Sequence, residues 1–376
     1  MTSTNGSLGR PISLIRKWWR APLWTVQLAT GAKSFADNPI LGSADLNRRG
    51  LHVARLKTAH ALARRRRARL AHLVPEDLRE EFDRNGFVVV RNFLPDEDFG
   101  ALKSILHTEL PSRVHQQGDT ITRRVTVGPA MLNRIPQLGT LLRAPVWNGL
   151  MSYVASSRSK PLYYIQTILG GVVDGPADPQ LELHADTFHP SLKAWLFLTD
   201  VPDDGRPLTY VAGSHRLSPE RIAWEHRKSV EVMASGDPLS RRGSFRISAD
   251  ELPALGLPQP THFAVPANTL VVVDTCGFHA RGDSDRPTTR VELWAYCRQS
   301  PFVPWAAGDF LSLPPFAIRR AEWLNRLHDW LDRRGWKKQH WKPDGLKRPT
   351  EPHADAIAAE APAPIQDRRQ PSSRAA

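Results

Sequence analysis

The sequence predicts a mainly β protein with flanking helices, an α+β chain whose strands form a sandwich or barrel. Two observations predict it. From about residue 161 onward, short apolar runs alternate with clusters of Gly, Pro and Asp. Strands at this spacing are typical of sandwiches and barrels, whereas a parallel βαβ array would place helices between them. The chain has 376 residues, 41% of them hydrophobic, so it is long enough to bury a sizeable core.

The formal net charge of +13 is concentrated at the N-terminus. Residues 1–75 contain 14 Lys or Arg against Asp37 and Asp45, an excess of 12 positive charges. Residues 319–348 repeat the pattern, with ten basic residues against four acidic ones. Such local excess indicates a polyanionic partner or an anionic surface.

The basic N-terminal region also has helical periodicity. Residues 12–28 carry an apolar stripe, interrupted by Pro22, and residues 51–73 predict a second helix that ends before Pro75. The stripe consists of Ile12, Ile15, Trp19, Leu23 and Val26. Tryptophans beside cations favour the headgroup zone of a bilayer. We therefore expect residues 1–75 to form a basic, partly amphipathic helical arm. The alternatives to membrane contact are a solvated charged face and binding of nucleic-acid phosphates, for which no base-reading fold is present.

The remaining segments follow in order. Residues 76–94 predict a short helix, a turn at Asn85-Gly86 and a strand, after which Pro95 opens an acidic helix. The predicted strands are PLYYIQTIL, LELHAD, KAWLFLTDV, PLTYVAG, HFAVP, TLVVVD and RVELWAYC. Residues 319–348 predict a basic, tryptophan-containing helical segment, and 349–376, rich in Ala, Pro and Ser, predict a disordered tail.

Nothing in the sequence predicts export or a membrane span. No window approaches the roughly 20 apolar residues that cross a bilayer, and the N-terminus has no clear signal-peptide cleavage site. The two cysteines, Cys276 and Cys297, are too few for a disulfide framework and are expected to be reduced. We expect a cytoplasmic protein, peripheral on the inner membrane where its basic segments contact it.

The segment LELHAD places two candidate metal ligands together. In a strand, His184 and Asp186 share one face, and an imidazole with a carboxylate suits a divalent metal. His279 follows an apolar strand and is the candidate third donor. Arg290, eleven positions later, opens the next strand on the same parity as Glu292. A barrel interior would then hold two histidines, one carboxylate and a cation.

These features together resemble the phytanoyl-CoA dioxygenase-like family of Fe(II)- and 2-oxoglutarate-dependent oxygenases. The resemblance rests on the His-x-Asp pair, the distant histidine, the arginine spacing and the stretches GFVVVRNFL, KAWLFLTDV and GSHR. It covers roughly residues 76–300 and implies a double-stranded β-helix, the cupin-like jelly roll, as the core of a domain over 76–318.

The resemblance also implies the roles of five residues. His184, Asp186 and His279 would bind Fe(II) and serve as the catalytic triad, leaving positions open for cosubstrate and oxygen. Arg290 would bind the far carboxylate of 2-oxoglutarate, since a guanidinium meets a carboxylate through two parallel hydrogen bonds. Trp195 would line the cosubstrate pocket.

The implied activity is that of a dioxygenase. It would use O₂ to convert 2-oxoglutarate to succinate and CO₂ and hydroxylate a small or lipid-linked substrate. Related halogenating enzymes have a small residue in place of the triad carboxylate, so Asp186 favours hydroxylation. The alternatives are a non-catalytic β-barrel scaffold at a membrane surface and a nucleic-acid-modifying oxygenase. The substrate depends on variable loops.

Other polar residues have competing interpretations. Arg281 and Arg286 are alternative partners for the cosubstrate, but they lie in a Gly- and Asp-rich turn that favours a solvated loop. Lys193 lies on the same strand face as Trp195, where it would contact a substrate carboxylate. Its alternative interpretation is a surface lysine with its charge in solvent. His189 and His215 are expected to be structural.

Overall fold

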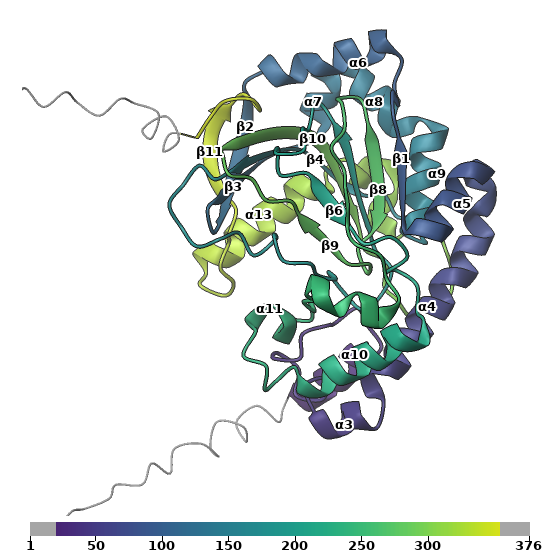
Figure 1. The fold of residues 1–376 in the computed structure, drawn as a ribbon. Helices are drawn as coiled ribbons and strands as arrows, with labels where there is room; N and C mark the ends of the chain where they lie inside the picture. Colours follow the sequence, from purple (N-terminus) through teal and green to yellow (C-terminus); the bar gives the residue numbers. More distant parts are fainter. Residues whose placement is uncertain (1–19, 354–376) are drawn as a thin grey trace, which may run out of the picture.

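The computed structural model describes residues 20–353, apart from the side chains of residues 314 and 315. Its main feature is an eight-stranded antiparallel sheet, with a three-stranded sheet facing it (Figure 1). In spatial order the large sheet contains β1 (Phe87–Val90), β8 (Leu270–Asp274), β5 (Leu192–Phe197), β10 (Thr288–Cys297), β4 (Leu162–Gly170), β3 (Thr120–Thr126), β2 (Leu110–Gln117) and β11 (Lys342–Lys347). The small sheet contains β7 (Thr261–His262), β6 (Leu208–Tyr210) and β9 (His279–Arg281). The predicted α+β jelly roll is confirmed.

Helices surround these sheets. They are α2 (Ala21–Leu28), α3 (Ala44–Arg48), α4 (Leu51–Leu70), α5 (Glu76–Asn85), α6 (Asp96–Lys103), α7 (Pro129–Arg134), α8 (Pro136–Arg143), α9 (Pro145–Val154), α10 (Pro219–Glu231), α11 (Pro238–Arg241), α12 (Pro314–Ala317) and α13 (Arg320–Arg333). Short 3₁₀ turns occupy Ala71–Leu73, Ser104–His107, Ala249–Glu251, Pro253–Leu255 and Phe310–Ser312. No helix within residues 20–353 is both long enough and apolar enough to cross a membrane.

Strand β8 shows how the core is divided between the two faces of the large sheet. Leu270 and Val272 pack into the cluster that includes Trp147 of α9, whereas Val271 and Val273 pack into the cluster that includes Tyr210 of the small sheet. Because neighbouring side chains of a strand point to opposite faces, a run of apolar residues is buried on both sides. The prediction of TLVVVD as a strand is therefore confirmed.

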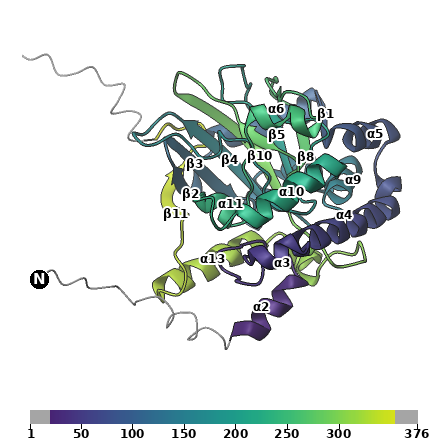
Figure 2. The ribbon, with the colours of Figure 1, turned by 60° about the horizontal axis from the view of Figure 1, so that its bottom comes forward.

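Helix α4 packs on the body of the protein, beside α9 and α10 (Figure 2). Arg66 is 1% exposed and donates hydrogen bonds to Ser156 and to backbone carbonyls beyond β10. Arg67 forms a 2.7 Å ion pair with the buried carboxylate of Asp274. Burial of these cations is tolerated because acceptors surround each guanidinium. The expectation of an arm separate from the barrel is therefore wrong for this helix.

The rest of the predicted arm is only partly described. Ile12, Ile15 and Trp19 of its stripe lie outside the described residues, whereas Leu23 and Val26 are exposed on α2. Arg55 of α4 donates hydrogen bonds to the carbonyls of Leu28, Thr30 and Ala32, which hold the following turn against the body. The domain boundaries at residues 75, 318 and 348 stay predictions.

Several segments differ from the predicted secondary structure. LELHAD forms isolated bridges rather than a strand, and of HFAVP only His262 lies in a strand, β7, while Val265 forms an isolated bridge. Strands β2 and β3 were not among the predicted strands. Within the segment predicted to be helical, residues 342–347 form β11 and pair with β2 at the sheet edge. Pro343 and charged residues give β11 no apolar alternation, so pairing with β2 decides its conformation.

The start of the predicted disordered tail contacts the sheet. The Thr167 hydroxyl donates a 2.7 Å hydrogen bond to the Pro349 carbonyl, and Thr350 donates one of 3.0 Å to the Leu106 carbonyl. These contacts place residues 349–353 against the body. Residues 354–376 lie outside the described part of the chain.

Candidate metal centre

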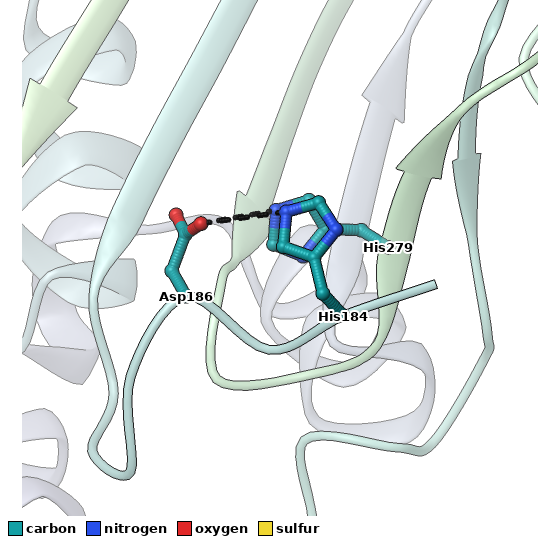
Figure 3. Close-up of side chains that lie close together, drawn as sticks. All are labelled: His184, Asp186 and His279. Atoms are coloured by element: carbon teal, nitrogen blue, oxygen red, sulfur yellow. Dashed lines mark ion pairs between the residues drawn. The ribbon is translucent and has the colours of Figure 1, made fainter. Parts of the chain in front are cut away.

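His184, Asp186 and His279 converge at the edge of the space between the two sheets (Figure 3). The Nε2 atoms of the two histidines lie 3.6 and 3.7 Å from Oδ1 of Asp186, and the imidazole centroids are 4.5 Å apart. One donor atom from each residue lies within 4.8 Å of the others. Two imidazoles and one carboxylate that face one common point are the donor set of non-haem Fe(II) oxygenases.

Hydrogen bonds orient both imidazoles toward this centre. Nδ1 of His184 lies 2.8 Å from the carbonyl of Glu182, and Nδ1 of His279 lies 3.0 Å from that of Gly277. A proton on Nδ1 that is donated to a carbonyl leaves the Nε2 lone pair free to bind a metal. Both Nε2 atoms are buried without a hydrogen-bond partner among the described residues. Since buried polar atoms are normally satisfied, these two fit a metal ion.

The backbone fixes the spacing of the three ligands. His184 and His279 exchange two backbone hydrogen bonds of 3.0 Å, and the amide of Asp186 donates one of 2.9 Å to the Thr275 carbonyl. The loop that contains the first two ligands is thus joined to the segment that contains the third. Local bridges rather than a continuous strand bring them together, although they lie about 95 positions apart in the sequence.

The electrostatic environment holds the ligands in the forms that bind metals. Burial lowers the pKa of His279 to about 3, with His184 contributing, and burial also lowers the pKa of His184. Burial alone would raise the pKa of Asp186, but Lys193 and the two histidines hold it well below its usual range. At neutral pH the histidines are therefore neutral and the carboxylate is ionised, as metal ligation requires.

A cavity of about 350 Å³ opens beside the three ligands. Its lining includes six cations, which are Lys33, Arg124, Lys193, Arg281, Arg290 and Arg298. Four aromatic side chains also line it, namely Trp195, Trp294, Tyr296 and Trp341. The cavity is thus basic and aromatic, with space for a small organic molecule beside the metal ligands.

Arg290 is held in place by a row of side chains across three strands. Its Nε donates a 2.8 Å hydrogen bond to Glu292, and its Nη1 donates one of 2.5 Å to the Arg206 carbonyl. Glu292 accepts a further bond of 2.7 Å from Gln166, and Gln166 accepts one of 2.7 Å from Arg124. Strand register places Arg124, Gln166 and Glu292 opposite one another on β3, β4 and β10. Glu292, which is 0% exposed, therefore fixes the guanidinium of Arg290 at the cavity wall.

The other predicted residues take distinct places. Arg281 lines the cavity and pairs with buried Asp178, whereas exposed Arg286 pairs with Asp204 at 2.6 Å. Trp195 lies opposite Trp294 on the neighbouring strand, and both side chains face the cavity.

Lys193 is a cavity residue, because its Nζ forms a 2.7 Å ion pair with Asp186 and its side chain is 18% exposed. His189 and His215 are buried and are not among the cavity residues.

Sequence reasoning missed several cavity residues. Arg298 continues the alternation of Arg290, Glu292, Trp294 and Tyr296 beyond the end of β10, so its parity was a usable signal. Lys33, in contrast, reaches the site from the segment between α2 and α3, and its Nζ donates a hydrogen bond to the Asp186 carbonyl. Burial, followed by the charge of Arg298, lowers the pKa of Lys33 to about 8. No local pattern marks this lysine as a site residue.

Comparison with known proteins gave one family and several structural likenesses. The model of the family described as phytanoyl-CoA dioxygenase (PhyH) matches residues 82–237. The epimerase SnoN, solved with Fe3+, alpha ketoglutarate and nogalamycin RO, is 21% identical, with 60% of this chain and 83% of that chain covered and a TM-score of 0.39. HygX from Streptomyces hygroscopicus, solved with nickel, 2-oxoglutarate and hygromycin B, is 16% identical, with 59% and 86% covered and a TM-score of 0.33.

A curated protein also matches locally. Delta-aminolevulinic acid dehydratase from Pongo abelii is 32% identical over 122 residues, which cover 26% of this chain and 36% of that protein. The chain therefore spans about a third of the length of the curated relative, and a local match of this extent transfers no activity.

The family match and the geometry of the site concern the same part of the molecule. The matched segment contains the first two of the three converging ligands, and the jelly roll brings the third to them from beyond its end. Residues 82–237 of this chain are therefore similar to the family described as phytanoyl-CoA dioxygenase (PhyH), and two of the three candidate ligands lie within them.

Proposed function

We propose that this protein is a dioxygenase that hydroxylates a small or lipid-linked substrate while converting 2-oxoglutarate to succinate and CO₂. The observation that carries the proposal is the pair of buried, unpartnered Nε2 atoms facing the carboxylate of Asp186. His184, Asp186 and His279 would hold the Fe(II). The iron, when bound, supplies the activation of O₂ and the oxidation of the substrate C–H bond.

Arg290 and Trp195 would bind the cosubstrate. Nη2 of Arg290 has no hydrogen-bond partner among residues 20–353, while its Nε and Nη1 are occupied. The guanidinium is therefore rigid and has one group free for the far carboxylate of 2-oxoglutarate. Trp195 lines the same cavity and would add an apolar surface that limits access of water.

The two buried imidazoles support an active site rather than a non-catalytic scaffold. A barrel kept for binding alone has no requirement for two desolvated imidazoles, since each buried unpaired nitrogen costs about 1–3 kcal/mol. The cavity beside them, of about 350 Å³, has the size of a small-molecule site, which supports a small substrate. Related halogenating enzymes have a small residue where this chain has Asp186, and halide binds there instead. Because Asp186 is present, hydroxylation of carbon is the proposed outcome.

Turnover of 2-oxoglutarate tests this function. We expect the Fe(II)-loaded chain to release succinate slowly without substrate, and faster when an extract of small molecules is added. Mass spectrometry of that extract should show a product heavier by one oxygen. Loss of two hydrogens or an unchanged mass would contradict hydroxylation while keeping the oxygenase. Absence of succinate under every condition would contradict the oxygenase itself.

We also propose that α13 and the residues after it contact an anionic bilayer. Trp323, Leu327 and Trp330 lie at helical spacing on α13 and are 39%, 49% and 38% exposed, and Trp336 beyond the helix is 68% exposed. The opposite side of α13 is anchored, because Asp329 accepts a 2.9 Å hydrogen bond from Arg113. Exposed tryptophans within a basic segment suit the headgroup region, where each cation contributes about 1 kcal/mol.

Sedimentation of the full chain with vesicles checks this contact. We expect binding to vesicles rich in phosphatidylserine, weaker binding in high salt, and little binding to neutral vesicles. Replacing Trp330 and Trp336 by alanine should reduce binding about tenfold, whereas Trp305→Ala, which removes a tryptophan that is 56% exposed outside α13, should not. Equal binding by both variants would contradict the proposed surface.

A further inference from the structure

The cavity beside the metal ligands carries more positive charge than its proposed occupants, a divalent metal and 2-oxoglutarate, would balance. Six cations line it, and three carboxylates form ion pairs with them. Asp186 at the metal centre pairs with Lys193, Asp178 with Arg281, and Glu292 with Arg290. A divalent metal and the dianion of 2-oxoglutarate add no net charge. An excess of three positive charges therefore remains in a partly desolvated space, which is unfavourable without a further anion.

The excess is concentrated at the end of the cavity away from Arg290. Arg290 and Arg298 lie eight residues apart on one face of β10 and its extension, so their backbones are separated by about 26 Å. A five-carbon dicarboxylate bound to Arg290 cannot reach both. Trp294 and Tyr296 occupy the face between them, with ring centroids 5.6 Å apart and an interplanar angle of 2°. The cavity thus has two separate cationic ends joined by a flat aromatic wall.

Three cations meet at this second end. The charges of Lys193 and Arg298 act on Lys33, and both Lys33 and Lys193 contact Asp186. Arg298 has no hydrogen-bond or ion-pair partner in the described part of the chain, and its Nε is fully buried. Unlike Arg281 and Arg290, it has no carboxylate to offset its charge. A buried guanidinium nitrogen without an acceptor fits an oxyanion, since buried polar atoms are normally hydrogen-bonded and a guanidinium binds oxyanions strongly.

Two of these residues lie outside the segment that the family model matches. Lys33 precedes residue 82 and Arg298 follows residue 237, whereas Lys193 lies within the match. Arg55 holds the turn that ends at Ala32, immediately before Lys33, against the body. The region before the matched segment therefore contributes directly to the cavity and fixes the position of one of its cations.

On the proposed oxygenase function, we infer that the substrate is an organic oxyanion, whose phosphate or carboxylate group binds between Lys33, Lys193 and Arg298. Its body then lies along Trp294 and Tyr296, which line the same cavity as the metal ligands. Arg298 donates to the anion through its unpartnered guanidinium, and the two lysines add charge. The site selects acidic substrates and holds them beside the metal centre, since Lys33 and Lys193 also contact Asp186.

Binding of two probe anions to the full chain tests this inference. Inorganic phosphate and benzoate are titrated anaerobically into the Fe(II)-loaded chain saturated with 2-oxoglutarate, with tryptophan fluorescence as the readout. Equilibrium dialysis with labelled 2-oxoglutarate runs in parallel. We expect at least one probe to bind without displacing 2-oxoglutarate, with phosphate preferred if the substrate is phosphorylated and benzoate if it is a carboxylate.

The variants separate the anion site from the cosubstrate site. Arg298→Gln should weaken binding of the probe about tenfold or more, with a much smaller effect on 2-oxoglutarate. Arg286→Gln removes an exposed arginine outside the cavity and should change neither. If 2-oxoglutarate binds but neither probe does, or if the probe displaces 2-oxoglutarate, the anion site is refuted and the oxygenase stands. If 2-oxoglutarate itself does not bind, both proposals fail.

Discussion

Replacing His184 or Asp186 by alanine is expected to abolish turnover of 2-oxoglutarate and to weaken binding of Fe(II) by more than about a hundredfold. Each substitution removes one of three donor atoms, and loss of even an outer hydrogen-bond partner of a metal ligand costs 10- to 100-fold. Anaerobic equilibrium dialysis measures the effect, with one Fe(II) per wild-type chain as the reference. Each substitution also removes one other contact, the bond of His184 to the Glu182 carbonyl or the ion pair of Asp186 with Lys193, so the fold of each apo variant is checked as well.

His262→Ala is the matched control for this experiment. His262 is exposed on β7 and is not a cavity residue, so its removal should leave Fe(II) binding and turnover unchanged. Circular dichroism of all variants distinguishes loss of a ligand from loss of structure. Unchanged iron affinity in both His184→Ala and Asp186→Ala would refute the metal centre.

Replacing Arg290 by alanine is expected to raise the concentration of 2-oxoglutarate required for binding about a hundredfold or more, with a much smaller effect on iron. The far carboxylate of the cosubstrate would lose its partner in a partly desolvated site, a loss of several kcal/mol. Binding of labelled 2-oxoglutarate measures the effect directly. Because Glu292 is 0% exposed, the single substitution also leaves a buried carboxylate unpaired, which is destabilising.

A Glu292→Gln background and two further substitutions, Arg286→Ala and Arg281→Ala, show whether the loss of binding is specific to Arg290. Arg290→Ala in a Glu292→Gln chain avoids the unpaired carboxylate and should still lose binding of 2-oxoglutarate, whereas Glu292→Gln alone should lose less. Arg286→Ala should have no effect, since this arginine is exposed and paired with Asp204. A large loss in Arg281→Ala, with none in Arg290→Ala, would show that Arg281 holds the cosubstrate.

Much of the central sheet and the three candidate ligands could be predicted from local patterns. Strands β4, β5, β8 and β10 consist of apolar runs bounded by Gly, Pro and Asp, and burial on one or both faces gives such runs a clear periodicity. The spacing of His184 and Asp186, two positions apart, is also a local pattern of the sequence. Their shared direction survives although the segment forms isolated bridges in place of a strand, because an extended backbone alternates side chains in either case.

Partners of charged residues, in contrast, depend on contacts between distant segments. The sequence by itself determined the number and location of the cations in residues 1–75. It does not distinguish an exposed arginine from a buried one. Arg66 and Arg67 are held by acceptors more than 80 positions away, and Lys33 reaches a carbonyl 153 positions away. Only the tertiary structure decided that these cations belong to the body of the protein and to its cavity. The physical reason is that desolvation of a charge is tolerated only where folding supplies acceptors, and sequence spacing alone does not determine that placement.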